Sequence, residues 1–141
     1  MSPDRSSSLP DRAPPGSPRV SVLVLDDDQE VSQSLRELIE DQGYRAICVA
    51  NGRDALAVLE HERPSLMLVD LFMPVMNGVE FLHVVKTRES LAAIPRVIMT
   101  ATNDYMIGVK EDLPVLYKPI DLDSLLRMLR KYCDPCPVLS R

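Results

Sequence analysis

The chain has 141 residues, of which 45% are hydrophobic and 26% are charged, and its formal net charge is −5. These values are typical of a protein with one domain-sized core, and an acidic chain is unsuited to binding a phosphate backbone, so we expect no nucleic-acid partner. No apolar run approaches the length of a membrane span or forms a secretory leader, so we expect no membrane association and a cytoplasmic location.

The first segment, residues 1–19, is rich in proline and serine. It holds five of the twelve prolines of the chain and very few hydrophobic residues. Such a segment cannot bury enough apolar surface to offset the entropy lost on ordering. We therefore predict a disordered leader over residues 1–19, followed by one domain over residues 20–132.

Within residues 20–132, short apolar runs alternate with segments of helical periodicity. Strands are predicted at residues 20–25, 45–50, 66–70, 95–100 and 113–117. Helices are predicted between and after them, with apolar faces at Val31, Leu35, Leu38 and Ile39, at Leu56 and Leu59 of residues 53–61, at Val79, Leu82 and Val85, and at Leu122, Leu125, Leu126 and Leu129. Gly43 is expected to end the first helix and Asp121 to cap the last one.

The stretch between the fourth and fifth strands, residues 101–112, is short. It has room for one or two helical turns around residues 104–109, so the fourth helix is expected to be shortened. Strands that alternate with helices predict an α/β fold with a parallel sheet covered on both faces. We expect the flavodoxin-like, doubly wound, five-stranded sheet of order 2-1-3-4-5.

The last segment, residues 133–141, is predicted to be a flexible tail. It contains Cys133 and Cys136 in a CxxC spacing, and Cys48 is the third cysteine of the chain. Three cysteines do not make a disulfide framework and fit a reducing compartment. One CxxC pair is a weak indication of a redox or metal site, so the role of Cys133 and Cys136 is left open.

Polar residues follow the apolar strands at the ends where open parallel sheets form their sites. The first strand runs into Asp26, Asp27 and Asp28, and the third ends at Asp70. The fourth strand ends at Thr100 and the fifth is followed by Lys118. Because the first and third strands are neighbours in the predicted order, Asp26, Asp27 and Asp70 should converge. Three carboxylates with Lys118 opposite suit a hard divalent cation, Mg²⁺, and a nucleophilic aspartate that accepts a phosphoryl group.

Taken singly, these residues have ordinary interpretations. Asp28 is suited to capping a helix, Thr100 to filling a β-strand, and Lys118 to an exposed surface. It is their joint placement at one edge of a sheet that favours a functional site.

Four motifs in order resemble the receiver domain of two-component response regulators, of the stand-alone single-domain type. They are "VLVLDDDQEV", "LVDLFMPVMNG", "RVIMTA" and "LYKPID", and the likeness spans roughly residues 20–131. The resemblance implies that Asp70 is the phosphoacceptor and that Thr100 and Lys118 contact the phosphoryl group. It implies that Asp26, Asp27, Asp70 and the backbone carbonyl of Phe72 hold Mg²⁺. It also implies a cis Lys118-Pro119 bond, and Val115 occupies a position that is often aromatic in the family.

The resemblance implies a histidine kinase or a histidine phosphotransfer protein as the phosphoryl donor and a separate downstream protein partner. The exposed side of the first helix is the expected docking surface, and homodimerisation on phosphorylation is left open. No conventional enzyme class is expected beyond Mg²⁺-dependent self-phosphorylation from phosphohistidine and self-dephosphorylation. Two alternatives remain: a phosphorylation-independent interaction module of the same fold, and a phosphatase that forms an aspartyl-phosphate.

Overall fold

The structure is a computed structural model that describes residues 20–73, 75–101 and 113–133. Five parallel strands form one sheet of order β2-β1-β3-β4-β5, which confirms the predicted topology. The strands are β1 (Ser21–Leu25), β2 (Arg45–Val49), β3 (Leu66–Asp70), β4 (Arg96–Thr100) and β5 (Val115–Tyr117). The helices are α2 (Gln29–Asp41), α3 (Gly52–Leu59), α4 (Gly78–Thr87), α5 (Glu89–Ala92) and α6 (Leu122–Cys133).

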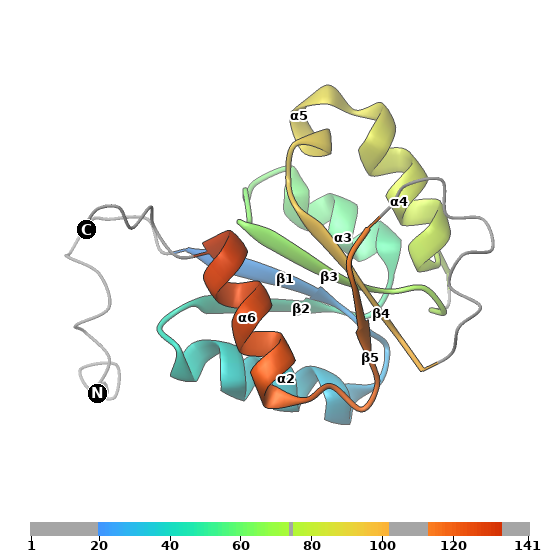
Figure 1. Ribbon diagram of the computed structural model, residues 1–141. Helices are drawn as coiled ribbons and strands as arrows, with labels where there is room; N and C mark the ends of the chain where they lie inside the picture. The colour runs from blue at the N-terminus through green and yellow to red at the C-terminus, as the bar shows by residue number, and fades with distance from the viewer. Residues whose placement is uncertain (1–19, 74, 102–112, 134–141) are drawn as a thin grey trace, which may run out of the picture.

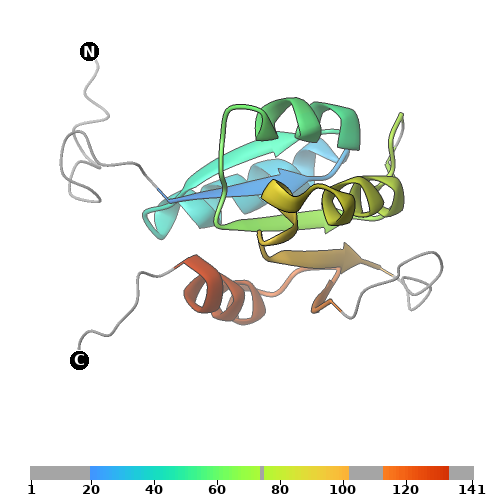
Figure 2. The same ribbon diagram turned by 90° about the horizontal axis from the view of Figure 1, so that it is seen from above.

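The helices form a layer on each face of the sheet (Figures 1 and 2). Helices α2 and α6 lie on one face, and α3, α4 and α5 lie on the other. Successive strand residues point to opposite faces, so Val22, Val24 and Leu68 pack toward α2 and α6, whereas Leu23 and Leu25 pack toward α3 and α4. Each face thus has its own buried cluster, which we name the α2–α6 cluster and the α3–α4 cluster.

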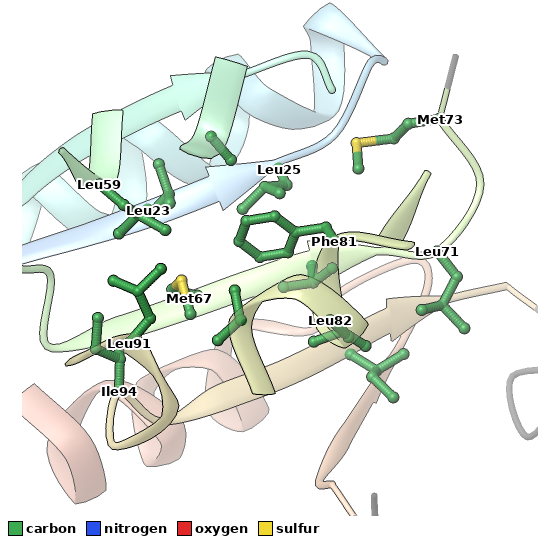
Figure 3. Close-up of a cluster of buried hydrophobic side chains, with 14 residues drawn as sticks. Leu23, Leu25, Leu59, Met67, Leu71, Met73, Phe81, Leu82, Leu91 and Ile94 are labelled. Atoms are coloured by element: carbon green, nitrogen blue, oxygen red, sulfur yellow. The ribbon is translucent and has the colours of Figure 1, made fainter. Parts of the chain in front are cut away.

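The α3–α4 cluster fixes the segment that follows β3. Phe81 of α4 is fully buried among Leu23, Leu25 and Met67 of the sheet, and Leu71 and Met73 extend the cluster beyond the end of β3 (Figure 3). Burying such a side chain contributes roughly 1.5–3 kcal/mol. The chain directly after Asp70 is therefore anchored in the core.

Local capping explains where the helices begin and end. The Asp28 carboxylate accepts from the N–H groups of Glu30 and Val31 and caps α2. Gly43 follows that helix with a φ of 96°, a conformation that glycine adopts without strain. Asn77 and Glu80 form a reciprocal capping box at the start of α4. Asp121 accepts from the N–H groups of Asp123 and Ser124, which confirms its predicted capping role.

Several element boundaries differ from the sequence-based expectation. The structure adds α5, and β5 begins at Val115 rather than at residue 113. Cys133, assigned above to the tail, is the last residue of α6 and is buried in the α2–α6 cluster. Several predictions fall outside the described residues. They concern the leader (residues 1–19), the helix around residues 104–109, and the rest of the tail (134–141) with Cys136. Among the described helices, none is long and apolar enough to cross a bilayer.

Candidate functional site

Three carboxylates meet at the carboxyl edge of the sheet, as predicted. Leu25 pairs with Val69 in the register of β1 and β3, so Asp26 and Asp70 follow on adjacent strands. One carboxylate oxygen from each of Asp26, Asp27 and Asp70 lies within 4.8 Å of the others. Asp26 and Asp70 are buried, whereas Asp27 is exposed at the mouth of this acidic pocket.

Lys118 supplies the positive charge of the acidic pocket. Its Nζ lies 2.7 Å from Asp26 Oδ2 and 3.3 Å from Asp70 Oδ2. The backbone N–H of Lys118 donates to the Thr100 carbonyl at 2.8 Å, so the residue continues the pairing of β5 with β4. The predicted cis Lys118-Pro119 bond is present.

Backbone N–H groups hold the second oxygen of each buried carboxylate. The Asp28 N–H donates to Asp26 Oδ1 at 2.9 Å, and the Phe72 N–H donates to Asp70 Oδ1 at 3.2 Å. Asp26 therefore has both oxygens engaged, and its side chain is 0% exposed. Its backbone is fixed as well, because Ser32 Oγ of α2 donates to the Asp26 carbonyl at 3.1 Å.

Burial and charge displace two pKa values in the pocket. Burial raises the pKa of Asp70 above its usual value, against the opposing effects of the Phe72 N–H and the Lys118 ammonium, and the nearby Asp26 carboxylate adds to the rise. Burial acts to lower the pKa of Lys118, but its hydrogen bond to Asp26 and the charge of Asp70 outweigh that effect and raise it. Lys118 thus keeps its proton while Asp70 carries a costly charge.

The donor chemistry of the pocket fits Mg²⁺. The ligands are oxygens only, they carry excess negative charge, and they lie close enough to share one ion. Asp26, Asp27 and Asp70 are the residues that would hold the ion. The Phe72 N–H reaches Asp70, so the backbone of Phe72 is at the pocket, and its carbonyl remains the predicted additional ligand.

Thr100 and the residues near Lys118 lie where the sheet order predicts. Met99 pairs with Asp70 across β3 and β4, and Thr100 is the next residue and is buried. Val115 is half-buried against the α3–α4 cluster, whereas Tyr117 is 50% exposed. The described residues of β5 thus place an aromatic ring on the surface beside Lys118, and none at the Val115 position.

The loop between β3 and α4 is held by contacts that the sequence analysis did not predict. Gly78 N–H donates to the Leu71 carbonyl at 3.0 Å, and Gly52 N–H of α3 donates to the Met76 carbonyl at 2.8 Å. Val75, the residue before Met76 in this loop, has a φ of 67°. This backbone conformation is unusual for a β-branched residue. Both glycines follow an asparagine, and Asn-Gly pairs are typical of turns, but such a pair does not reveal which segment the glycine will contact.

An apolar groove lies next to the acidic pocket, between α2 and the Lys118-Pro119 segment. Its volume is about 310 Å³. It is lined by Glu30, Val31, Ser34, Leu35, Leu38, Lys118, Pro119 and Ile120. Lys118 thus belongs to both the pocket and this α2 groove.

A family model described as "response regulator receiver domain" matches residues 22–130 of the chain. Among curated proteins, the sporulation initiation phosphotransferase F of Bacillus subtilis is 33% identical over 79% of this chain and 91% of that protein. An uncharacterised 14.6 kDa protein of Leptolyngbya boryana is 31% identical over 82% of this chain and 91% of its own length. The chain spans 56% of another relative, the transcriptional regulatory protein CrdR of Helicobacter pylori.

Solved structures show the same fold. The chemotaxis protein CheY4 of Vibrio cholerae superimposes with a TM-score of 0.74 at 28% identity, over 82% of this chain and 99% of that one. The receiver domain of the sensor histidine kinase PA1611 of Pseudomonas aeruginosa, solved with a magnesium ion in its active-site cleft, gives a TM-score of 0.74 at 23% identity, over 82% and 98%.

Proposed function

The chain belongs to the response regulator receiver domain family of two-component systems, and on this basis we propose that it takes a phosphoryl group from a phosphohistidine onto Asp70. The observation that carries the proposal is the geometry of Asp70: it is buried, it closes β3, and it shares Lys118 with Asp26. A carboxylate whose pKa is raised above the usual value is poorly solvated and suited to act as a nucleophile.

The proposed reaction transfers one phosphoryl group. An Asp70 carboxylate oxygen attacks phosphorus, an O–P bond forms as the N–P bond of phosphohistidine breaks, and the imidazole keeps the electron pair. Hydrolysis later returns the Asp70 carboxylate and inorganic phosphate. Mg²⁺, when bound by Asp26, Asp27 and Asp70, would supply charge neutralisation for the incoming phosphate. The magnesium ion in the PA1611 receiver structure supports this choice of metal.

Lys118 and Thr100 are proposed to respond to the new charge. Lys118 contacts two carboxylates, so a phosphoryl group on Asp70 gives its ammonium a stronger partner. Hydrogen bonds to charged groups contribute roughly 1.5–3 kcal/mol each. Converting a two-state equilibrium from 1:99 to 99:1 needs about 5.5 kcal/mol. Contacts from both side chains, made only after phosphorylation, are of the magnitude needed to switch the domain and control a downstream protein partner.

The α2 groove is the proposed docking surface for the donor, a histidine kinase or a histidine phosphotransfer protein. Its lining is largely apolar, with Val31, Leu35 and Leu38 among its residues, and it also includes Lys118. A partner helix seated there would bring its phosphohistidine next to Asp70. The family and the named phosphotransferase relative support this class of partner.

Intact-protein mass spectrometry after incubation with acetyl phosphate and Mg²⁺ tests the proposal. We expect a phosphoryl adduct on the wild-type chain and none on Asp70→Asn. An adduct of equal yield on both proteins would assign the acceptor to another residue. Mg²⁺ binding with no adduct, from acetyl phosphate or from a phosphorylated phosphotransfer protein, would favour the phosphorylation-independent interaction module.

The phosphatase alternative has less support from the described residues. A phosphatase of that kind would need an Asp-x-Asp nucleophile motif at the end of β1. The Asp28 carboxylate instead caps α2. The candidate nucleophile closes β3, where the receiver family has it.

A further inference from the structure

Helix α3 approaches the loop that follows Asp70 at one point, Gly52. The Gly52 N–H donates to the Met76 carbonyl at 2.8 Å, and Gly52 is buried at the start of α3. A Cβ built on Gly52 would lie 2.7 Å from Met76 Cγ, 2.9 Å from Met76 Sδ and 3.0 Å from the Met76 carbonyl oxygen. A side chain on residue 52 would therefore force Met76 to move.

The same loop is tied to Asp70 at its other contacts. Gly78 N–H donates to the Leu71 carbonyl, which joins the two ends of the loop, and a Cβ on Gly78 would lie 2.6 Å from Leu71 Cα. Leu71 and Met73 are buried on either side of Phe72, whose own side chain is 59% exposed. The Phe72 N–H is thereby held against Asp70 Oδ1. The Met76 carbonyl, which would lie 3.0 Å from the new Cβ, belongs to the same short loop, so we expect its displacement to reach these contacts.

We propose that Gly52 is a positioning residue for the acidic pocket. Because it has no Cβ, Met76 can pack against it, and this contact fixes the loop that places the Phe72 backbone next to Asp70. The inference rests on the proposed phosphoacceptor function, because it assigns to that site a supporting residue on α3, outside the strands that carry the carboxylates. The three atoms nearest to a Cβ on Gly52 all belong to Met76, so the proposed effect on the carboxylates runs through the loop.

The substitution Gly52→Ala tests the role with MgCl₂ as the probe. Displaced supporting groups typically weaken metal binding 10–100-fold, so we expect the Mg²⁺ Kd from calorimetric titration to rise by about ten-fold. Ala57→Gly is the matched control, because Ala57 is exposed on the same helix and its loss weakens α3 without touching the loop. This control should lower Tm and leave the Mg²⁺ Kd unchanged.

A second substitution separates positioning from general damage to the fold. Adding Met76→Ala to Gly52→Ala removes the two side-chain atoms that meet the new methyl group. We expect the double variant to recover most of the lost Mg²⁺ affinity, whereas Met76→Ala alone should not improve it. A Gly52→Ala protein that loses stability but binds Mg²⁺ within two-fold of the wild type would overturn the proposal.

Hydrogen exchange on the wild type decides the matter if Gly52→Ala does not fold. Mg²⁺ should slow exchange of the Gly52 amide more than that of the Arg45 amide, which donates to the Val20 carbonyl at the opposite edge of the sheet. If Mg²⁺ slowed exchange of the two amides equally, the proposed coupling between α3 and the acidic pocket would be contradicted.

The two proposals can fail separately. A wild type that binds Mg²⁺ but takes no phosphoryl group would refute the phosphoacceptor function, and the Mg²⁺ comparison would still decide the role of Gly52. A wild type that is phosphorylated, with an unchanged Mg²⁺ Kd in Gly52→Ala, would refute only the positioning role. A wild type with no measurable Mg²⁺ affinity would refute it too.

Discussion

Lys118 Nζ lies 2.7 Å from Asp26 Oδ2, although 92 positions separate the two residues in the sequence. The ion pair joins the chain after β5 to the end of β1 across the two strands between them, and the same ammonium reaches Asp70 on β3. The Asp26 side chain is fully buried, and this ion pair places a cation directly against it. Lys118 is thus a structural counter-ion before any phosphoryl group arrives.

Replacing Lys118 should therefore destabilise the fold. Lys118→Met leaves two buried carboxylates without their cation, and we expect the free energy of unfolding to fall by about 3 kcal/mol. Urea denaturation monitored by circular dichroism measures the change. Added Mg²⁺ should stabilise Lys118→Met more than the wild type, because the ion takes over the lost charge compensation. Lys86→Met, at an exposed site, is the control and should change stability by less than about 0.5 kcal/mol; an equal effect of both substitutions would argue against a buried counter-ion.

Asp70→Asn should stabilise the protein at neutral pH. The pKa of folded Asp70 is raised chiefly by burial, so above that pKa its negative charge reduces stability. As pH falls through the folded pKa, the folded wild type takes up a proton before the unfolded chain does, and the advantage of Asp70→Asn should shrink. Tm measured across the acidic to neutral range, without Mg²⁺, reports this. Asp41→Asn, an exposed acid at the end of α2, controls for the loss of one charge. An advantage that grows toward acid would reverse the assigned pKa direction.

Val75→Gly should also stabilise the fold. Val75 is 65% exposed, so little packing is lost, and its φ of 67° strains a β-branched residue. Relief of that strain, less the entropy that glycine adds to the unfolded chain, should gain about 1 kcal/mol. The control is Val84→Gly, inside α4, which should instead lower stability. Thermal denaturation measures the Tm of both variants. Stability lost in both variants would mean that the Val75 side chain makes a necessary contact.

Leu38→Glu should separate donor docking from chemistry. Leu38 lines the α2 groove and is not one of the three acids of the pocket. With a phosphotransfer protein that labels the wild type, we expect the transfer rate to fall roughly ten-fold, which corresponds to about 1.4 kcal/mol of lost docking energy. Labelling by acetyl phosphate should be unchanged. Glu60→Lys, on α3's side of the sheet, is the charge-change control. Loss of labelling from both donors would show that Leu38→Glu damages the site itself.

The residues of the pocket could be predicted because topology alone brings them together. Once β1 and β3 are neighbours, Asp26 and Asp70 must meet, and Lys118 follows from placing β5 beyond β4. The capping role of Asp28 could also be predicted, because helix capping depends on neighbouring residues only, and the structure confirms it. Thr100 was placed in the same way, at the buried end of β4 beside β3.

The contacts around the β3–α4 loop could not be predicted in the same way. Gly52 meets Met76 through a tertiary approach, and the Asn51-Gly52 pair indicates a turn without naming its neighbour. Helices α4 and α5 are separated by a single extended residue, Arg88. No glycine or proline stands there to indicate in the sequence that one helix ends and another begins. The burial of Cys133 did have a signal, because it continues the four-residue spacing of Leu125 and Leu129. Cys133 was instead grouped with the residues that follow it, whose composition predicted a tail.

Locating the acyl phosphate tests the central claim most directly. The chain is treated with acetyl phosphate and Mg²⁺, the acyl phosphate is reduced with borohydride, and peptide mass spectrometry then finds the reduced side chain. We predict reduction of Asp70 alone, with Asp26, Asp27 and Asp28 intact. Reduction at Asp26, Asp27 or Asp28, or at several of them alike, would contradict the assignment of Asp70 as the phosphoacceptor.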